Sequence, residues 1–246
     1  GEGAGRRTFL QELNKHGYTE SSFNEYLRSV AIKSTPGTRE AVVNVAVALI
    51  EQVYSWGYKM PYHWSGKYYK VGINPDWGLK LYTPGTTTFT QSCAAYAKVF
   101  AGGYANMASS INYCNTHYGV YSFDCSGFVN WAIANGFLMN NKESNSCWMY
   151  QPIAESKYDI ELNKNYAVCS PGDVIEGSGH ITLVVGIDES KKSYIVAEAT
   201  GWNKGWGGVR LSYYAFDKSG YHCKSLQYLY DQYETQKNSD NGGNCQ

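Results

Sequence analysis

The run DCSGFV at residues 124–129 places a thiol where a loop turns into a helix. The apolar residues that follow it fall on one side of a 3.6-residue period, and Gly136 provides a stop, so a helix is predicted from Cys125 to about Gly136. Exposed backbone N–H groups and the positive end of the helix dipole favour an anion at such a position. Because the thiolate is the reactive form of cysteine, Cys125 is the candidate nucleophile.

A thiol nucleophile needs a base, and the best candidate lies about 55 residues downstream. A Pro-Gly turn, a short strand and a glycine-rich bend are predicted to lead into a second strand that begins at His180. A third strand is predicted over residues 194–199, after a polar stretch at 188–192. His180 therefore stands at the mouth of a predicted hairpin.

The expected register of that hairpin brings a carboxylate to His180. If the hairpin is centred on Glu189, positions whose numbers sum to 378 face each other, and His180 stands opposite Glu198. Directly opposed residues have Cβ atoms about 4.5–5.5 Å apart. Glu198 is therefore the candidate for orienting the imidazole, with Asp188 and Asn203 as rivals. A Cys, a His and a polar orienting residue are the parts of a thiol acyl-transfer site.

These pieces, in this order, resemble the NlpC/p60 cysteine peptidases that trim bacterial peptidoglycan. The matching pieces are the run at 124–129, the Gly-Asp-Val at 172–174, the strand led by His180 and the Glu-Ala pair at 198–199. The Tyr-His-Trp-Ser-Gly at 62–66 also resembles the family's Tyr-x-Trp-Gly-Gly element, with a serine in place of its first glycine. The resemblance rests on the ordered set, because each piece alone is short.

The resemblance implies an α+β, papain-like NlpC/p60 fold, with helices packed on a central antiparallel sheet and the nucleophile at a helix N-terminus. It implies that Cys125 attacks a carbonyl carbon, that His180 acts as base and then as acid, and that Glu198 orients His180. Many members of the family carry a second histidine at the third position, so Glu198 departs from their pattern.

The resemblance also suggests which residues contact the substrate. Tyr62 is the candidate for positioning the substrate or supporting the oxyanion, together with the backbone N–H of Cys125. In some members the Asp and Ser that flank the nucleophile bind the free amine of a trimmed stem peptide, and Asp124 and Ser126 take that role here. Their chemistry fits, because a carboxylate pairs with an ammonium group and a hydroxyl accepts a hydrogen bond from it.

Aromatic residues are abundant, with 23 tyrosines and 7 tryptophans. They suggest a carbohydrate platform, but aromatic residues also fill cores and favour strands. Trp202 and Trp206 follow Glu198 closely and are candidate walls of the substrate cleft. Trp64, in the upstream Tyr-x-Trp element, is a further candidate for substrate binding.

The expected function is that of a secreted or cell wall-associated hydrolase that cleaves peptidoglycan stem peptides by thiol catalysis. By resemblance, the bond is that from γ-D-glutamate to a diamino acid, either diaminopimelate or lysine. No cofactor is expected. Two alternatives stay open: an N-acetylmuramoyl-L-alanine amidase, as in the related CHAP domains, and a catalytically quiet wall-binding module.

Charge and hydropathy argue against other partners. Twenty-one basic and 21 acidic residues give a formal net charge of zero, so no nucleic-acid partner is expected. No apolar run approaches the roughly 20 residues that a membrane helix requires. The chain begins with Gly1 instead of Met, so it is expected to be processed or trimmed. A monomer is expected.

Seven cysteines are unusual for a cytosolic hydrolase of this size. With Cys125 set aside, the other six can form up to three disulfides, as suits an oxidising compartment, or stay as free buried thiols. No Cys/His cluster has zinc spacing, so no metal site is expected. The six are Cys93, Cys114, Cys147, Cys169, Cys223 and Cys245.

The predicted organisation is one catalytic domain with appendages. Residues 1–35 are interpreted as a cap or a linker remnant, 36–232 as the catalytic domain, and 233–246 as a polar tail. The interval at about 67–123 is longer than the family's usual spacing and is interpreted as an insertion. Thr38 is predicted to cap a buried helix. The apolar stripe of that helix is Ala41, Val42, Val45, Ala46, Leu49 and Ile50.

Overall fold

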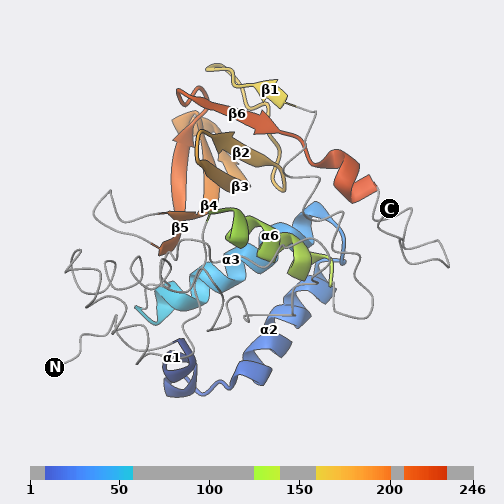
Figure 1. The fold of residues 1–246 in the computed structure, drawn as a ribbon, viewed down its shortest axis with the longest axis vertical. Helices are drawn as coiled ribbons and strands as arrows, with labels where there is room; N and C mark the ends of the chain where they lie inside the picture. The colour runs from blue at the N-terminus through green and yellow to red at the C-terminus, as the bar shows by residue number, and fades with distance from the viewer. Residues whose placement is uncertain (1–8, 58–124, 139–158, 201–207, 232–246) are drawn as a thin grey trace.

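The computed structural model describes residues 9–57, 125–138, 159–200 and 208–231 of the 246-residue chain (Figure 1). The described helices are α1 (Phe9–Lys15), α2 (Glu20–Lys33), α3 (Arg39–Ser55) and α6 (Cys125–Gly136). The described strands are β1 (Asp159–Glu161), β2 (Val174–Gly177), β3 (His180–Asp188), β4 (Ser193–Thr200), β5 (Gly208–Ala215) and β6 (Tyr221–Lys224).

Helix α3 forms where its cap and apolar stripe predict it. The Thr38 side chain accepts a hydrogen bond from the Ala41 backbone N–H, which satisfies one of the free donors of the first turn. All six residues of the predicted stripe are buried. The predicted helix is therefore confirmed. Helix α2 begins with a capping box, in which Thr19 and Ser22 exchange side-chain to backbone hydrogen bonds.

Helix α6 begins at Cys125 and ends at Gly136, as predicted. Every residue from Gly127 to Gly136 is buried, because the helix lies between α3 and the sheet (Figure 1). Gly136 does more than end the helix. A Cβ at this position would lie 2.6 Å from the Val42 Cα, so only glycine allows α3 and the end of α6 to approach so closely.

The strands form one antiparallel sheet in the order β1-β6-β2-β3-β4-β5. The predicted short strand, bend and His180 strand correspond to β2 and β3, and the predicted third strand lies within β4. Helices pack on this sheet, so the α+β class expected from the sequence is confirmed. The papain-like NlpC/p60 fold stays a prediction.

The sheet has a buried core on each face. One face packs against the helices, and Leu13 and Phe23 from the first 35 residues are part of that core. We call the core on the other face the second core. It contains the disulfide that joins Cys169 to Cys223. Cys93, Cys114, Cys147 and Cys245 lie outside the described residues. The second core consists of Cys169, Ile175, Val184, Tyr194, Val196, Tyr214, Phe216 and Cys223.

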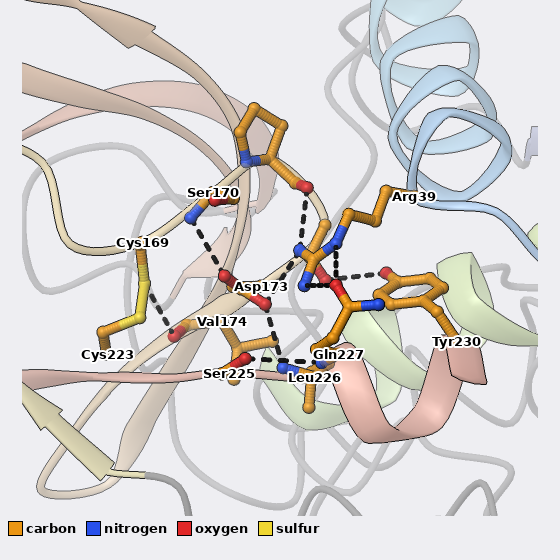
Figure 2. Close-up of polar contacts among 12 residues, drawn as sticks. Arg39, Cys169, Ser170, Asp173, Val174, Cys223, Ser225, Leu226, Gln227 and Tyr230 are labelled. Carbon is orange, nitrogen blue, oxygen red and sulfur yellow. Dashed lines mark hydrogen bonds and ion pairs between the residues drawn. A yellow bond between two sulfur atoms is a disulfide. The ribbon is translucent and has the colours of Figure 1, made fainter. Parts of the chain in front are cut away.

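A buried carboxylate ties three segments together before β2 (Figure 2). Asp173 accepts a 2.9 Å hydrogen bond from the Arg39 guanidinium, and it also accepts the backbone N–H groups of Ser170 and Leu226 at 2.9 Å. The Tyr230 hydroxyl donates to the Gly172 carbonyl at 2.7 Å. These bonds join the start of α3, the turn at 170–173 and the helical turn at 227–231. We call this set the Asp173 network.

Within the described ranges, no helix has both the length and the apolar character needed to cross a membrane.

Candidate active site

Cys125 is the first residue of α6, so its thiol lies at the N-terminus of the helix, the end whose backbone N–H groups have no carbonyl partner within the helix. The thiol is not in a disulfide, and the residue is half-buried against the helix-side core. Helix α6 packs on β3 and β4, the two strands that carry the other candidate catalytic residues. The position at a helix start agrees with the prediction from the sequence.

His180 is the first residue of β3 and is set in place by a tight hairpin with β2. Gly177 and His180 form the last pair of the ladder, which leaves Ser178 and Gly179 as the loop. Gly179 has a φ of +73°, a conformation that favours glycine. The hairpin therefore fixes the backbone from which the imidazole projects.

His180 contacts both of its expected partners. Its Nε2 lies 2.9 Å from Glu198 Oε1, and its side chain also hydrogen-bonds Cys125. Burial alone lowers the pKa of His180, but the hydrogen bonds and negative charges of Cys125 and Glu198 outweigh burial and raise this pKa to about 9. His180 is therefore an imidazolium at neutral pH in this arrangement.

The register between β3 and β4, which brings His180 and Glu198 into contact, differs from the predicted one. Next to the site, Leu183 pairs with Ala197, so the partners' numbers sum to 380 and not to 378. Continued along the strands, this register places Glu198 opposite Thr182, one diagonal step from His180. The direct opposition predicted from the sequence is wrong. A shift of two residues keeps both side chains on one face, and diagonal neighbours stay within reach of long side chains.

Glu198 is almost fully enclosed, with 1% of its side chain exposed. Burial raises the pKa of this carboxyl, yet the bond to His180 and the charges of His180 and Arg210 lower it below its usual value overall. Oε1 also accepts a 3.0 Å hydrogen bond from the Tyr214 hydroxyl, and Oε2 lies 3.7 Å from Arg210 Nε. The carboxylate is therefore ionised although it is buried.

The two ring nitrogens of His180 have separate partners. Since an ionised Glu198 accepts only, Nε2 carries the proton of their hydrogen bond, and this assignment follows from the network. The remaining nitrogen, Nδ1, is the one left for the thiol of Cys125. The cluster can thus hold a thiolate beside an imidazolium whose orientation is fixed by a carboxylate.

Arg210 and Tyr214, both on β5, are members of this cluster that the sequence analysis missed. Strand β5 was not predicted, although Arg210, Ser212 and Tyr214 alternate with apolar Val209 and Leu211 at a strand period. This alternation was the available signal.

The other candidates are placed as follows. Ser126 is the second residue of α6 and is half-buried. The rival Asp188 lies at the far end of β3, where its side chain accepts the Lys191 backbone N–H and caps a turn, so it does not serve His180. The remaining candidates lie outside the described residues; these are Tyr62, Trp64, Asp124, Trp202, Asn203 and Trp206.

Within the described ranges, Cys169, Asp173 and Cys223 bring potential metal-ligand atoms within 4.8 Å of one another. The two sulfurs are bonded to each other and offer no thiolate. The oxygens of Asp173 already accept hydrogen bonds from Arg39, Ser170 and Leu226. This cluster does not fit a metal ion.

Comparisons of the chain with protein-family models, with curated proteins and with solved structures find no match.

Proposed function

We propose that this chain is a thiol hydrolase that cleaves an amide bond in peptidoglycan stem peptides. The observation that carries the proposal is the chain of contacts from Cys125, at the start of α6, through His180 to the buried carboxylate of Glu198. Acyl transfer to sulfur requires a nucleophile that contacts a base, and a base that contacts an orienting group.

The reaction follows from the placement of the protons. The Cys125 thiolate attacks the amide carbon, and the backbone N–H of Cys125, at the start of α6, is the proposed donor to the resulting oxyanion. The His180 imidazolium gives its proton to the leaving amine, and the C–N bond breaks to leave a thioester. His180 then takes a proton from water, the hydroxide adds to the thioester, and the acid is released as the thiolate and the imidazolium are restored.

The substrate class comes from the resemblance to NlpC/p60 peptidases. The proposed bond is that from γ-D-glutamate to diaminopimelate or lysine, and the proposed location is secreted or wall-associated. The disulfide between Cys169 and Cys223 supports an oxidising compartment, because disulfides persist there and are rare in the cytosol.

The test is mass spectrometry of defined stem peptides and of digested sacculi after incubation with the protein. Three samples are compared: the parent chain, the parent chain with its thiol blocked by alkylation, and Cys125→Ala. Cleavage after D-glutamate by the untreated parent alone supports the proposal. Cleavage that persists in Cys125→Ala overturns thiol catalysis.

Two other outcomes favour the alternatives. Products with an intact L-Ala N-terminus and a freed lactyl group on the sugar indicate a CHAP-like amidase. Binding to sacculi without any product, unchanged in Cys125→Ala, indicates a wall-binding module.

A further inference from the structure

We propose that Tyr214 is a positioning residue of the thiol site, which holds Glu198 on His180 against the pull of Arg210. This inference rests on the proposed thiol chemistry, but not on the identity of the substrate.

The geometry gives Glu198 two competing directions. Oε1 lies 2.9 Å from His180 Nε2 on β3, while Oε2 lies 3.7 Å from Arg210 Nε on β5. Arg210 is directly opposite Glu198 in the β4–β5 ladder, so a small rotation of the carboxylate would shorten this ion pair to a direct hydrogen bond. A guanidinium is a strong partner for a carboxylate, and that pair would draw Glu198 away from the imidazole.

Tyr214 is placed to prevent that rotation. Its hydroxyl donates at 3.0 Å to Oε1, the same oxygen that receives His180. One oxygen with two fixed donors cannot turn without breaking both hydrogen bonds. Glu198 is 1% exposed, so water offers little compensation for a lost donor.

Tyr214 remains a donor across the working pH range. Burial, and then the charge of Glu198, raise the pKa of its hydroxyl above the usual value for tyrosine. Its ring is held edge-on to Tyr221 at 5.4 Å, and the Lys218 ammonium lies 4.5 Å from the ring centre. The hydroxyl therefore stays protonated, and the packing of its ring keeps it directed at the Glu198 carboxylate.

The groups around the carboxylate come from four elements. Helix α6 supplies Cys125, β3 supplies His180, α3 supplies Tyr54, and β5 supplies Arg210, Tyr214 and Ser212, whose side chain also hydrogen-bonds Glu198. The Tyr54 hydroxyl accepts the Leu211 backbone N–H, and burial raises its pKa, so it stays neutral near Glu198. Arg210 is thus the cation that competes with His180 for Glu198 among these groups.

The decisive measurement is the pKa of His180, read from the NMR titration of its ring signals, in Tyr214→Phe. This change removes the hydroxyl and keeps the ring that packs on Tyr221, so a purely structural role predicts no change. If Tyr214 positions Glu198, the pKa of His180 falls by about one unit because the carboxylate turns to Arg210. An unchanged or higher pKa overturns the proposal.

A second variant tests the competitor. In Arg210→Met the pKa of His180 is expected to stay the same or to rise. When Tyr214→Phe is added to Arg210→Met, the pKa of His180 is expected to fall by less than Tyr214→Phe alone makes it fall. An equal fall in both backgrounds overturns the role of Arg210. Tyr213→Phe is the matched control, because Tyr213 is a neighbouring tyrosine that is 55% exposed, and no change is expected there.

The rate of Cys125 alkylation by iodoacetamide, measured against pH, reports the same site without a substrate. The change in this rate at the high-pH end of the profile is expected to move with the pKa of His180. If the parent cleaves no peptidoglycan but Tyr214→Phe still shifts both titrations, the proposed substrate fails and the positioning role stands. If the parent cleaves peptidoglycan and neither titration moves, the positioning role fails alone.

Discussion

Two buried carboxylates of this protein, Asp173 and Glu198, each lie beside an arginine but differ in their other partners. Asp173 lies 2.9 Å from the Arg39 guanidinium, and its other partners are backbone N–H groups. Glu198 lies 3.7 Å from Arg210, and its closest partner is the ring of His180 at 2.9 Å. Both are nearly inaccessible, with 3% and 1% of the residue exposed.

The difference lies in whether the partners can change their charge. Arginine and backbone amides keep their protons at every working pH, so the Asp173 network can only hold segments together. Histidine can gain and lose a proton, so Glu198 can act on a partner that takes part in the proposed chemistry. The same carboxylate-arginine pairing therefore supports stability in one region and, under the proposed function, the orientation of a base in the other.

The largest expected effect is that of His180→Gln, which changes the candidate active site and leaves the Asp173 network unchanged. The glutamine amide can still donate to Glu198, but it cannot accept a proton from the thiol or protonate a leaving amine. We expect kcat/KM on a cleaved stem peptide to fall by about 10⁴-fold or more. The rate is measured per folded molecule, because a loss of activity that only follows unfolding would contradict the comparison.

The next effect concerns the region of the Asp173 network. Replacing Cys169 and Cys223 together by alanine removes a cross-link between residues 54 positions apart. The chain-entropy relation gives a loss of about 4 kcal/mol in the free energy of unfolding. Urea unfolding measures it, while the activity of the folded fraction should be kept. A stability equal to the parent's would show that the unfolded chain is constrained by other means.

A smaller loss of stability is expected for Asp173→Asn. The amide cannot accept from Arg39, Ser170 and Leu226 together, and the Arg39 charge loses its counter-ion. We expect about 2–3 kcal/mol from urea unfolding, with kcat/KM per folded molecule unchanged. Asp217→Asn, at an exposed position, is the matched control and should change neither quantity. Lost activity in a well-folded Asp173→Asn protein would erase the distinction between the two carboxylates.

The smallest expected effect is that of Glu198→Gln on the pH profile. The pKa of His180 is raised to about 9, so the high-pH limb of kcat/KM should lie there in the parent and move toward 6.5 in the variant. At pH 7 we expect about a 4-fold loss of kcat/KM, because at a pKa of 6.5 only about a quarter of His180 is protonated. A high-pH limb that does not move would show that Glu198 does not set the charge of His180.

The raised pKa of His180 also makes the free energy of unfolding depend on pH. Its contribution is fully present below the unfolded pKa of about 6.5 and is lost as the pH rises through about 9. Urea unfolding of the parent between these values should show this loss, and Glu198→Gln should reduce it.

The sequence predicted the parts of this protein that depend on local signals. The Thr38 cap, the start of α6 at Cys125 and the strand that begins at His180 are each marked by neighbouring residues. These signals also brought the candidate site together, because contact between His180 and Glu198 needs only the correct face of a hairpin.

The sequence did not predict what depends on pairing between distant strands. Strand β5, with Arg210 and Tyr214, joins the site only through its ladder with β4. The exact register was missed because the loop after β3 forms a 3-10 turn at Glu189–Lys191 and then a left-handed residue, Lys192, with a φ of 46°. Neither choice is evident from a polar loop sequence.

The irregularity between Val184 and Gly186 decides whether Glu198 and His180 lie on the same face of the sheet. Near the loop the paired numbers sum to 381, as for Ile187 and Tyr194, and past the irregularity they sum to 380. Had the first register continued, Val185 would pair with Val196 and Glu198 would lie opposite Leu183, so Glu198 and His180 would be on opposite faces of the sheet. By staying unpaired, Val185 in β3 thus keeps Glu198 and His180 on the same face. Deleting Val185 would make the ladder continuous without changing these partners, because Val184 would still pair with Val196 and Glu198 would still lie opposite Thr182, on the same face as His180.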